Sequence, residues 1–151
     1  MRDEISTAMK EALKAKDQLA LGTMRLISAA LKDRDIAARS TGNSEGISDE
    51  EILGLLQTMI KQRKESAKMY RDGDRPELAD IEEQEIVIIQ QFLPQQLDAA
   101  GMQVAIELAI DKTGASSVKD MGQVMAFLKN GYAGQMDFSA ASKAVKATLM
   151  G

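Results

Sequence analysis

The chain has 151 residues, of which 44% are hydrophobic and 28% charged, and its net charge of −4 argues against indiscriminate nucleic-acid binding. It contains neither Cys nor His, which excludes disulfides, Cys nucleophiles, His bases and Cys/His metal sites. Aromatic residues make up only 3% whereas there are ten Met, and this indicates closely packed helices rather than sheets.

Apolar residues repeat at helical spacing from the start of the chain. A stripe between Ile5 and Leu13 predicts a first helix. Asp17 is a suitable N-cap for a second helix, which we expect to end near Arg39. The small polar residues 40–46 then predict a mobile loop.

Two further helices are predicted before the first proline-marked break. Ser48 followed by Glu51 has the pattern of a capping box and opens the third helix, which Gly73 ends. Pro76 suits the first position of a fourth helix. The run Ile86–Ile89 also has the composition of a buried strand, but we interpret it as helix because Gln and Glu flank it and no turn signal interrupts it.

Pro94 marks a predicted domain boundary, because the residue before a proline disfavours the α conformation. The sequence therefore predicts an all-α protein with an N-terminal antiparallel helical bundle, residues 1–93, followed by a small three-helix domain, residues 94–151. No apolar run is long enough to span a membrane, and the amino terminus resembles neither a signal nor a transit peptide. We expect a cytoplasmic protein without a cofactor or metal.

The three helices of the second domain are marked by their ends. Asp98 caps the first of them, and Gly114 closes it in a left-handed conformation. Ser117 to Asp120 opens the next, and either Asp137 or Ser139 opens the last.

Glycine within a predicted helix requires a reason, because it costs about 1 kcal/mol relative to alanine. We expect Gly122 to allow close packing against a neighbouring helix, and Gly54 and Gly101 to do so more weakly.

A row of cations on the third helix forms the first candidate site. The four residues share one face at spacings of i, i+3, i+7 and i+10: Lys61, Lys64, Lys68 and Arg71. One interpretation is a stripe that contacts phosphates. The alternative is a solvated face balanced by the acidic residues of the following loop.

Two arginines fall among apolar residues. Arg63 lies in the centre of the apolar stripe of the third helix, and Arg25 lies between Leu21 and Leu26. A buried guanidinium requires an acidic partner, so we expect structural ion pairs from Arg25 and Arg63. The candidate partners lie on the fourth helix: Glu82, Glu83 and Glu85. Alternatively, Arg63 faces a groove for a partner.

Several stretches of the chain have a distinctive order and spacing. They are Met24–Ile27, Lys61–Ser66, Arg75 with Glu77–Ala79, Phe92–Leu97 and, most specifically, Thr113–Met125, TGASSVKDMGQVM. Together they resemble the GatB/YqeY family over nearly the whole chain. The carboxy-terminal part is similar to the tail of the B subunit of tRNA-dependent amidotransferases, which convert Glu-tRNA(Gln) or Asp-tRNA(Asn) to the amide with glutamine as ammonia donor.

The resemblance implies a role beside a carbon–nitrogen ligase rather than a complete enzyme, because the tail helps hold tRNA while the chemistry lies on other domains. It implies tRNA and amidotransferase subunits as partners. The candidate RNA contacts on the last three helices are Lys119, Lys129, Lys143 and Lys146. One departure is the stretch Ala133–Asp137, where the family often has a basic Lys-Gly-Arg type loop.

Two other functions compete with RNA binding. A Met-rich helical bundle can offer an apolar groove to a partner protein, with Met121, Met125 and Phe138 as anchors. A Ser–Ser–Lys amidase centre would use Ser116, Ser117 and Lys119, but residues at a helix start are better explained as caps, and no base or oxyanion hole accompanies them. We therefore assign no catalytic residue.

Overall fold

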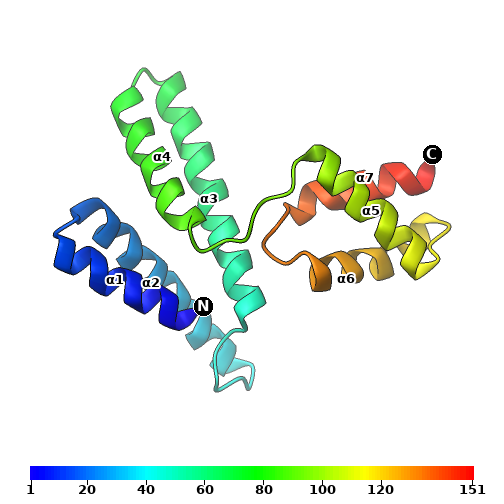
Figure 1. The fold of residues 1–151 in the computed structure, drawn as a ribbon, viewed down its shortest axis with the longest axis horizontal. Coiled ribbons are helices and arrows are strands. Elements are labelled where there is room, and N and C mark those ends of the chain that lie inside the picture. Colours follow the sequence, from blue (N-terminus) through cyan, green and yellow to red (C-terminus); the bar gives the residue numbers. More distant parts are fainter. The chain divides into compact units, whose positions relative to one another are not determined.

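A computed structural model describes residues 1–151 and contains helices but no strands (Figure 1). In chain order the helices are α1 (Arg2–Ala15), α2 (Gln18–Ser40), α3 (Asp49–Asp72), α4 (Pro76–Gln90), α5 (Ala99–Thr113), a short 3-10 turn η1 (Val118–Asp120), α6 (Met121–Gly131) and α7 (Phe138–Met150). The all-α prediction is confirmed. The chain divides into two compact units, which we call unit 1 (Met1–Leu93) and unit 2 (Pro94–Gly151).

Two helices of unit 1, α2 and α3, begin where polar side chains replace missing backbone partners. Asp17 Oδ1 accepts a hydrogen bond from Ala20 N at 3.0 Å at the start of α2. At the start of α3, Ser48 Oγ accepts from Glu51 N at 3.2 Å, and Ser48 N donates to the Glu51 carboxylate at 2.8 Å. Pro76 is the first residue of α4. The predicted caps and capping box are confirmed.

The same logic sets the helix ends of unit 2. Asp98 accepts from Gly101 N at 2.7 Å, and Gly114 ends α5 with a φ of 68°. Between the two candidates for the start of α7, the cap is Asp137, whose carboxylate accepts from Ser139 N at 2.8 Å. The sixth predicted helix begins as the 3-10 turn η1 and becomes α-helical only at Met121.

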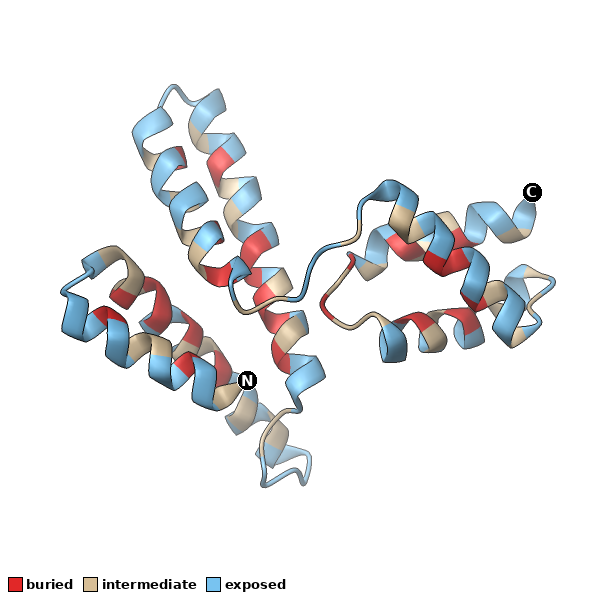
Figure 2. Ribbon diagram, in the orientation of Figure 1, coloured by how far each residue is buried: buried red, intermediate tan, exposed pale blue.

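Each unit has its own apolar core (Figure 2). In unit 1 the helices α1 and α2 pack as one pair and α3 and α4 as another. The core between them includes the fully buried side chains of Met24, Ile27, Ile52, Leu56 and Ile89. The run Ile86–Ile89 is helical, as predicted, with Ile86 and Ile89 buried and Val87 67% exposed.

The core of unit 2 is built from small and branched side chains of α5, α6 and α7. Ala105, Ala109 and Ala141 are buried, so these helices approach closely, and Ile106, Val124 and Leu128 fill the space between them.

The glycines inside helices do not all serve close packing. A Cβ at Gly122 or at Gly54 would meet no atom within 4 Å. Only Gly101 is constrained, since its Cβ would lie 3.2 Å from both Leu97 Cδ2 and Asp98 Oδ1. The expectation of close packing at Gly122 and Gly54 is therefore wrong.

Candidate nucleic-acid interface

The cations predicted on α3 do not form one uniform stripe. Lys61, Lys64 and Lys68 are exposed and form no ion pair. Arg71 differs, because its Nη2 lies 2.7 Å from Glu83 Oε1 and 3.2 Å from Asp80 Oδ1 on α4. These carboxylates, first Glu83 and then Asp80, raise the pKa of Arg71. The charge of Arg71 is therefore already balanced within unit 1.

Arg63 lies at the boundary of the unit 1 core and pairs with one of the expected acids. Its Nε lies 2.7 Å from Glu85 Oε2, and the two side chains are 11% and 18% exposed. Arg63 Nη1 also donates to Met59 O at 3.2 Å. Glu82 forms no direct ion pair, and burial, followed by the charge of Glu85, raises its pKa.

The expectation for Arg25 requires correction. Its side chain is exposed on α2 and forms no ion pair. The fully buried Met24 and Ile27 project about 100° and 160° away from Arg25 around the helix, so Arg25 faces solvent.

The lysines of unit 2 are all exposed, and none forms an ion pair. They are Lys112, Lys119, Lys129, Lys143 and Lys146. Lys143 and Lys146 are three residues apart on α7 and therefore share a face. All the ion pairs of the chain lie in unit 1. Lys112 belongs with the four lysines singled out in the sequence.

Three carboxylates of unit 2 are used at helix starts instead of in ion pairs. Asp98 and Asp137 cap α5 and α7. Asp120 Oδ2 accepts from Ser116 N at 2.9 Å and from Ser117 N at 3.1 Å, and these backbone donors lower the pKa of Asp120. Ser116 and Ser117, the candidate serines of an amidase centre, therefore lie in a helix cap.

The stretch that replaces a basic loop has a structural role in unit 2. Gln135 O accepts from Leu97 N at 2.8 Å, and Gly134 O accepts from Gln96 Nε2. Gly134 has a φ of 75°, and Met136 is 2% exposed in the core. The segment Ala133–Asp137 thus fixes the approach to α5 and presents no cation.

The anchors proposed for a protein-binding groove are turned inward. Met121, Met125 and Phe138 are half-buried and pack against the core of unit 2. The exposed apolar side chains of α5 are Val104, at 66%, and Leu108, at 41%.

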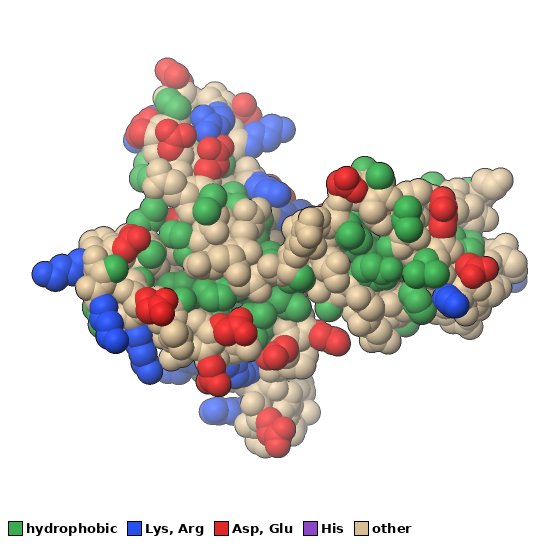
Figure 3. Space-filling view, in the orientation of Figure 1, with side chains coloured by type: hydrophobic (Ala, Val, Ile, Leu, Met, Phe, Trp, Pro, Cys, Tyr) green, Lys and Arg blue, Asp and Glu red, His purple; other side chains and the backbone are tan.

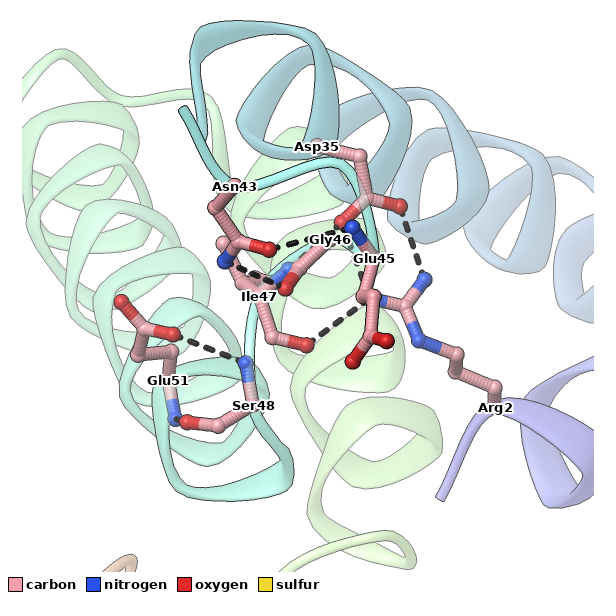
Figure 4. A network of polar contacts seen from close by, with 8 residues as sticks. All are labelled: Arg2, Asp35, Asn43, Glu45, Gly46, Ile47, Ser48 and Glu51. Carbon is pink, nitrogen blue, oxygen red and sulfur yellow. Dashed lines mark hydrogen bonds and ion pairs between the residues drawn. The ribbon is translucent and has the colours of Figure 1, made fainter. Parts of the chain in front are cut away.

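One polar network was not expected from the sequence (Figure 4). Arg2 Nη1 and Nη2 lie 2.7 and 2.8 Å from the two oxygens of Asp35. Arg2 Nη2 also donates to Ile47 O at 2.9 Å, and Ile47 N donates to Asp35 Oδ1 at 2.9 Å. The network joins α1, α2 and the loop before α3. No local sequence pattern predicts this network, because Arg2 and Asp35 are 33 residues apart.

The loop before α3 makes further hydrogen bonds beside this network. Asn43 Nδ2 donates to Gly46 O at 2.8 Å, and Asn43 Oδ1 accepts from Glu45 N at 3.1 Å. The hydrogen bond from Arg2, and then the backbone N–H of Ile47, lower the pKa of Asp35 to about 2. These contacts join the end of the loop, Asn43–Ile47, to α1 and α2.

Beside the network lies a shallow groove of about 360 Å³ between α1 and α2. Its apolar lining includes Ile5, Met9 and Leu31, and its charged lining includes Lys32 and Arg39. No group of three or more Asp or Glu side chains is arranged to hold a metal ion. No helix combines the length and hydropathy needed to cross a bilayer.

These features define a class of protein: two all-helical units with unpaired surface cations and no cluster of candidate metal ligands. The family model described as YqeY-like protein matches residues 2–149. The chain therefore belongs to the YqeY-like protein family.

Curated relatives of the chain carry one common name, "Altered inheritance of mitochondria protein 41, mitochondrial". The protein from Vanderwaltozyma polyspora is 32% identical over 120 residues, which cover 75% of this chain and 62% of the relative. The protein from Lachancea thermotolerans is 27% identical over 150 residues, which cover 94% and 75%. The chain thus spans less than two-thirds of the Vanderwaltozyma polyspora relative.

Proposed function

We propose that the chain is a non-catalytic accessory module that binds tRNA. The observation that carries this proposal is the set of exposed, unpaired lysines of unit 2: Lys112, Lys119, Lys129, Lys143 and Lys146. Phosphate binding draws its free energy from cations that replace the counterions of the nucleic acid. A lysine that is already paired with a carboxylate contributes less of this free energy. The five lysines of unit 2 are not paired.

The carboxylates of unit 2 form no ion pair with its lysines. Asp98, Asp120 and Asp137 are committed to backbone N–H groups at helix starts. The lysines form no such hydrogen bonds and no ion pairs. A strand of phosphates would therefore meet ammonium groups that are not individually neutralised, although the whole chain has a net charge of −4.

The choice of tRNA, and of amidotransferase subunits as protein partners, rests on the resemblance of unit 2 to the tail of the amidotransferase B subunit. In this proposal the glutamine-dependent carbon–nitrogen ligase chemistry belongs to the partner. The proposed compartment is the cytoplasm, in keeping with a Cys-free chain. The names of the curated relatives place those proteins in mitochondria and state no ligand.

The cations of α3 are left out of the proposed RNA surface. Arg71 is paired with two carboxylates, so it is not available to bind phosphate. Glu65 lies among the remaining lysines and adds a negative charge there. The solvated-face interpretation is therefore preferred for Lys61, Lys64 and Lys68.

The test is a titration of the purified full chain with total tRNA at two salt concentrations. We expect binding that weakens steeply as salt rises, since each phosphate contact contributes roughly 0.7–0.9 to the log–log slope. The variant K119Q/K129Q/K143Q/K146Q should bind more weakly and reduce that slope by about 3. Absence of binding at low salt would remove the RNA proposal and leave the protein-adaptor hypothesis.

A further inference from the structure

A second row of cations runs along α2 in unit 1. Arg25, Lys32 and Arg39 are separated by seven residues each, and all are exposed and form no ion pair. The residues between them on the same face are Ser28, Ala29, Asp35 and Ile36, of which Ala29 and Ile36 are exposed and uncharged. The one carboxylate on this face is Asp35, between Lys32 and Arg39, and it is paired with Arg2 of α1.

The spacing makes the row nearly straight. Seven residues are almost two helical turns, so successive cations are displaced by only about 20° around the axis. At a rise of about 1.5 Å per residue they lie roughly 10 Å apart along α2, and the row extends for about 21 Å. Because all three project from one 23-residue helix, the backbone fixes the separation of their Cα atoms.

The carboxylates near the row leave it positively charged. Asp35 lies beside Lys32 and Arg39, but its oxygens are occupied by Arg2 and by Ile47 N. Asp33 follows Lys32 directly and therefore projects about 100° away around the helix. The Arg2–Asp35 pair thus has a second consequence, since it prevents Asp35 from neutralising the row.

The surface around the row contains further cations and hydroxyl groups. Figure 3 shows Lys and Arg side chains along the edge of the α1–α2 hairpin, with Asp and Glu side chains among them. Lys32 and Arg39 also line the shallow groove, whose other polar lining includes Ser6 and Ser28. Hydroxyl groups are common phosphate ligands beside cations.

We propose that the Arg25–Lys32–Arg39 face of α2 binds the phosphate backbone of RNA. The inference rests on the proposed tRNA-binding function and adds a surface on unit 1 that neither the family match nor the relatives' names assign. A row of evenly spaced cations on one helix suits a polyanion with a regular charge repeat and contacts phosphates, so it positions the RNA without selecting its sequence.

The test compares two triple variants of the full chain with equal loss of charge. R25Q/K32Q/R39Q removes the proposed row, and K61Q/K64Q/K68Q removes three exposed, unpaired lysines from α3 of the same unit. All six positions are exposed, so both variants should retain the helical circular dichroism and melting temperature of the wild type. Each is titrated with total tRNA over a series of salt concentrations.

We expect the α2 variant to bind at least tenfold more weakly at low salt and to lower the log–log slope by about 2 to 3. The α3 variant should change affinity by less than threefold. Equal losses in the two variants would overturn the inference, because they would report general charge alone.

Unchanged binding by the α2 variant, together with a loss in the unit 2 variant, would overturn this inference but leave the proposed function intact. The face of α2 would then be reassigned to an acidic protein partner. If the wild type itself fails to bind tRNA at low salt, both proposals are wrong.

Discussion

The guanidinium of Arg2 forms a bidentate ion pair with the carboxylate of Asp35, with N–O distances of 2.7 and 2.8 Å. The same two side chains bond the backbone of Ile47, through its carbonyl oxygen and its N–H. One ion pair therefore fastens the first turn of α1, the last turns of α2 and the entry to α3. Its contribution to stability depends on the ionised state of Asp35.

That dependence predicts a loss of stability in acid. The pKa of Asp35 is lowered to about 2 from 3.8, so its contribution is complete above pH 3.8 and disappears as the pH falls through about 2. Because Arg2 is 40% exposed, we expect only about 1 kcal/mol at neutral pH. Urea unfolding of wild type and Asp35→Asn at pH 7 and pH 2.5 should show a difference in free energy of unfolding that shrinks at the lower pH. A constant difference would contradict the charge mechanism.

Gly46 is required beside this pair for two reasons that can be separated. Its φ is 93°, and a Cβ there would lie 2.5 Å from Asp35 Oδ1 and 2.8 Å from Arg2 Nη2. Gly42 has the same φ of 93° but no atom within 4 Å of its Cβ position. We expect Gly46→Ala to destabilise the chain by about 1–3 kcal/mol more than Gly42→Ala, measured by urea unfolding.

Gly42 is the matched control, since it has the same positive φ without the close contacts. Similar losses of stability in the two would show that the pair moves aside at little cost. The larger loss of stability in Gly46→Ala should persist in the Asp35→Asn background, because the amide of Asn occupies the same space as the carboxylate of Asp.

The local features of the fold were predictable from sequence, and the long-range contacts were not. Caps such as Asp17 and Ser48 act on backbone groups within three residues, so their patterns can be read directly. The Arg2–Asp35 contact depends instead on how a loop returns to α1. The seven-residue spacing of the α2 row was present in the sequence, but Arg25 was assigned to an ion pair because Leu21 and Leu26 flank it, and Leu26 is in fact 51% exposed.

The nearly buried pair of Arg63 and Glu85 predicts an asymmetric response to mutation. Arg63→Met leaves the Glu85 carboxylate, which is 18% exposed, without its partner, and we expect a loss of about 2 kcal/mol in the free energy of unfolding. Changing both residues to Met should recover most of this loss, because no unpaired charge remains.

A surface pair provides the control for this experiment. Arg75 and Glu77 are 60% and 58% exposed, so Arg75→Gln should leave the unfolding transition almost unchanged. Unchanged stability of Arg63→Met would show that the Arg63–Glu85 pair contributes no more than this exposed contact.

Open space around helical glycines predicts stabilising substitutions. Gly54 lies within α3 and a Cβ there would meet no atom within 4 Å, so Gly54→Ala should raise the free energy of unfolding by about 0.5–1 kcal/mol through a smaller loss of backbone entropy. Gly122 lies in the first turn of α6 and should give a smaller gain. Gly101→Ala is the control, because its Cβ would press on Leu97 and Asp98 at 3.2 Å, and it should give no gain. Thermal and urea unfolding of the three variants would check this order, and a loss of stability at Gly54 would contradict the open space around that position.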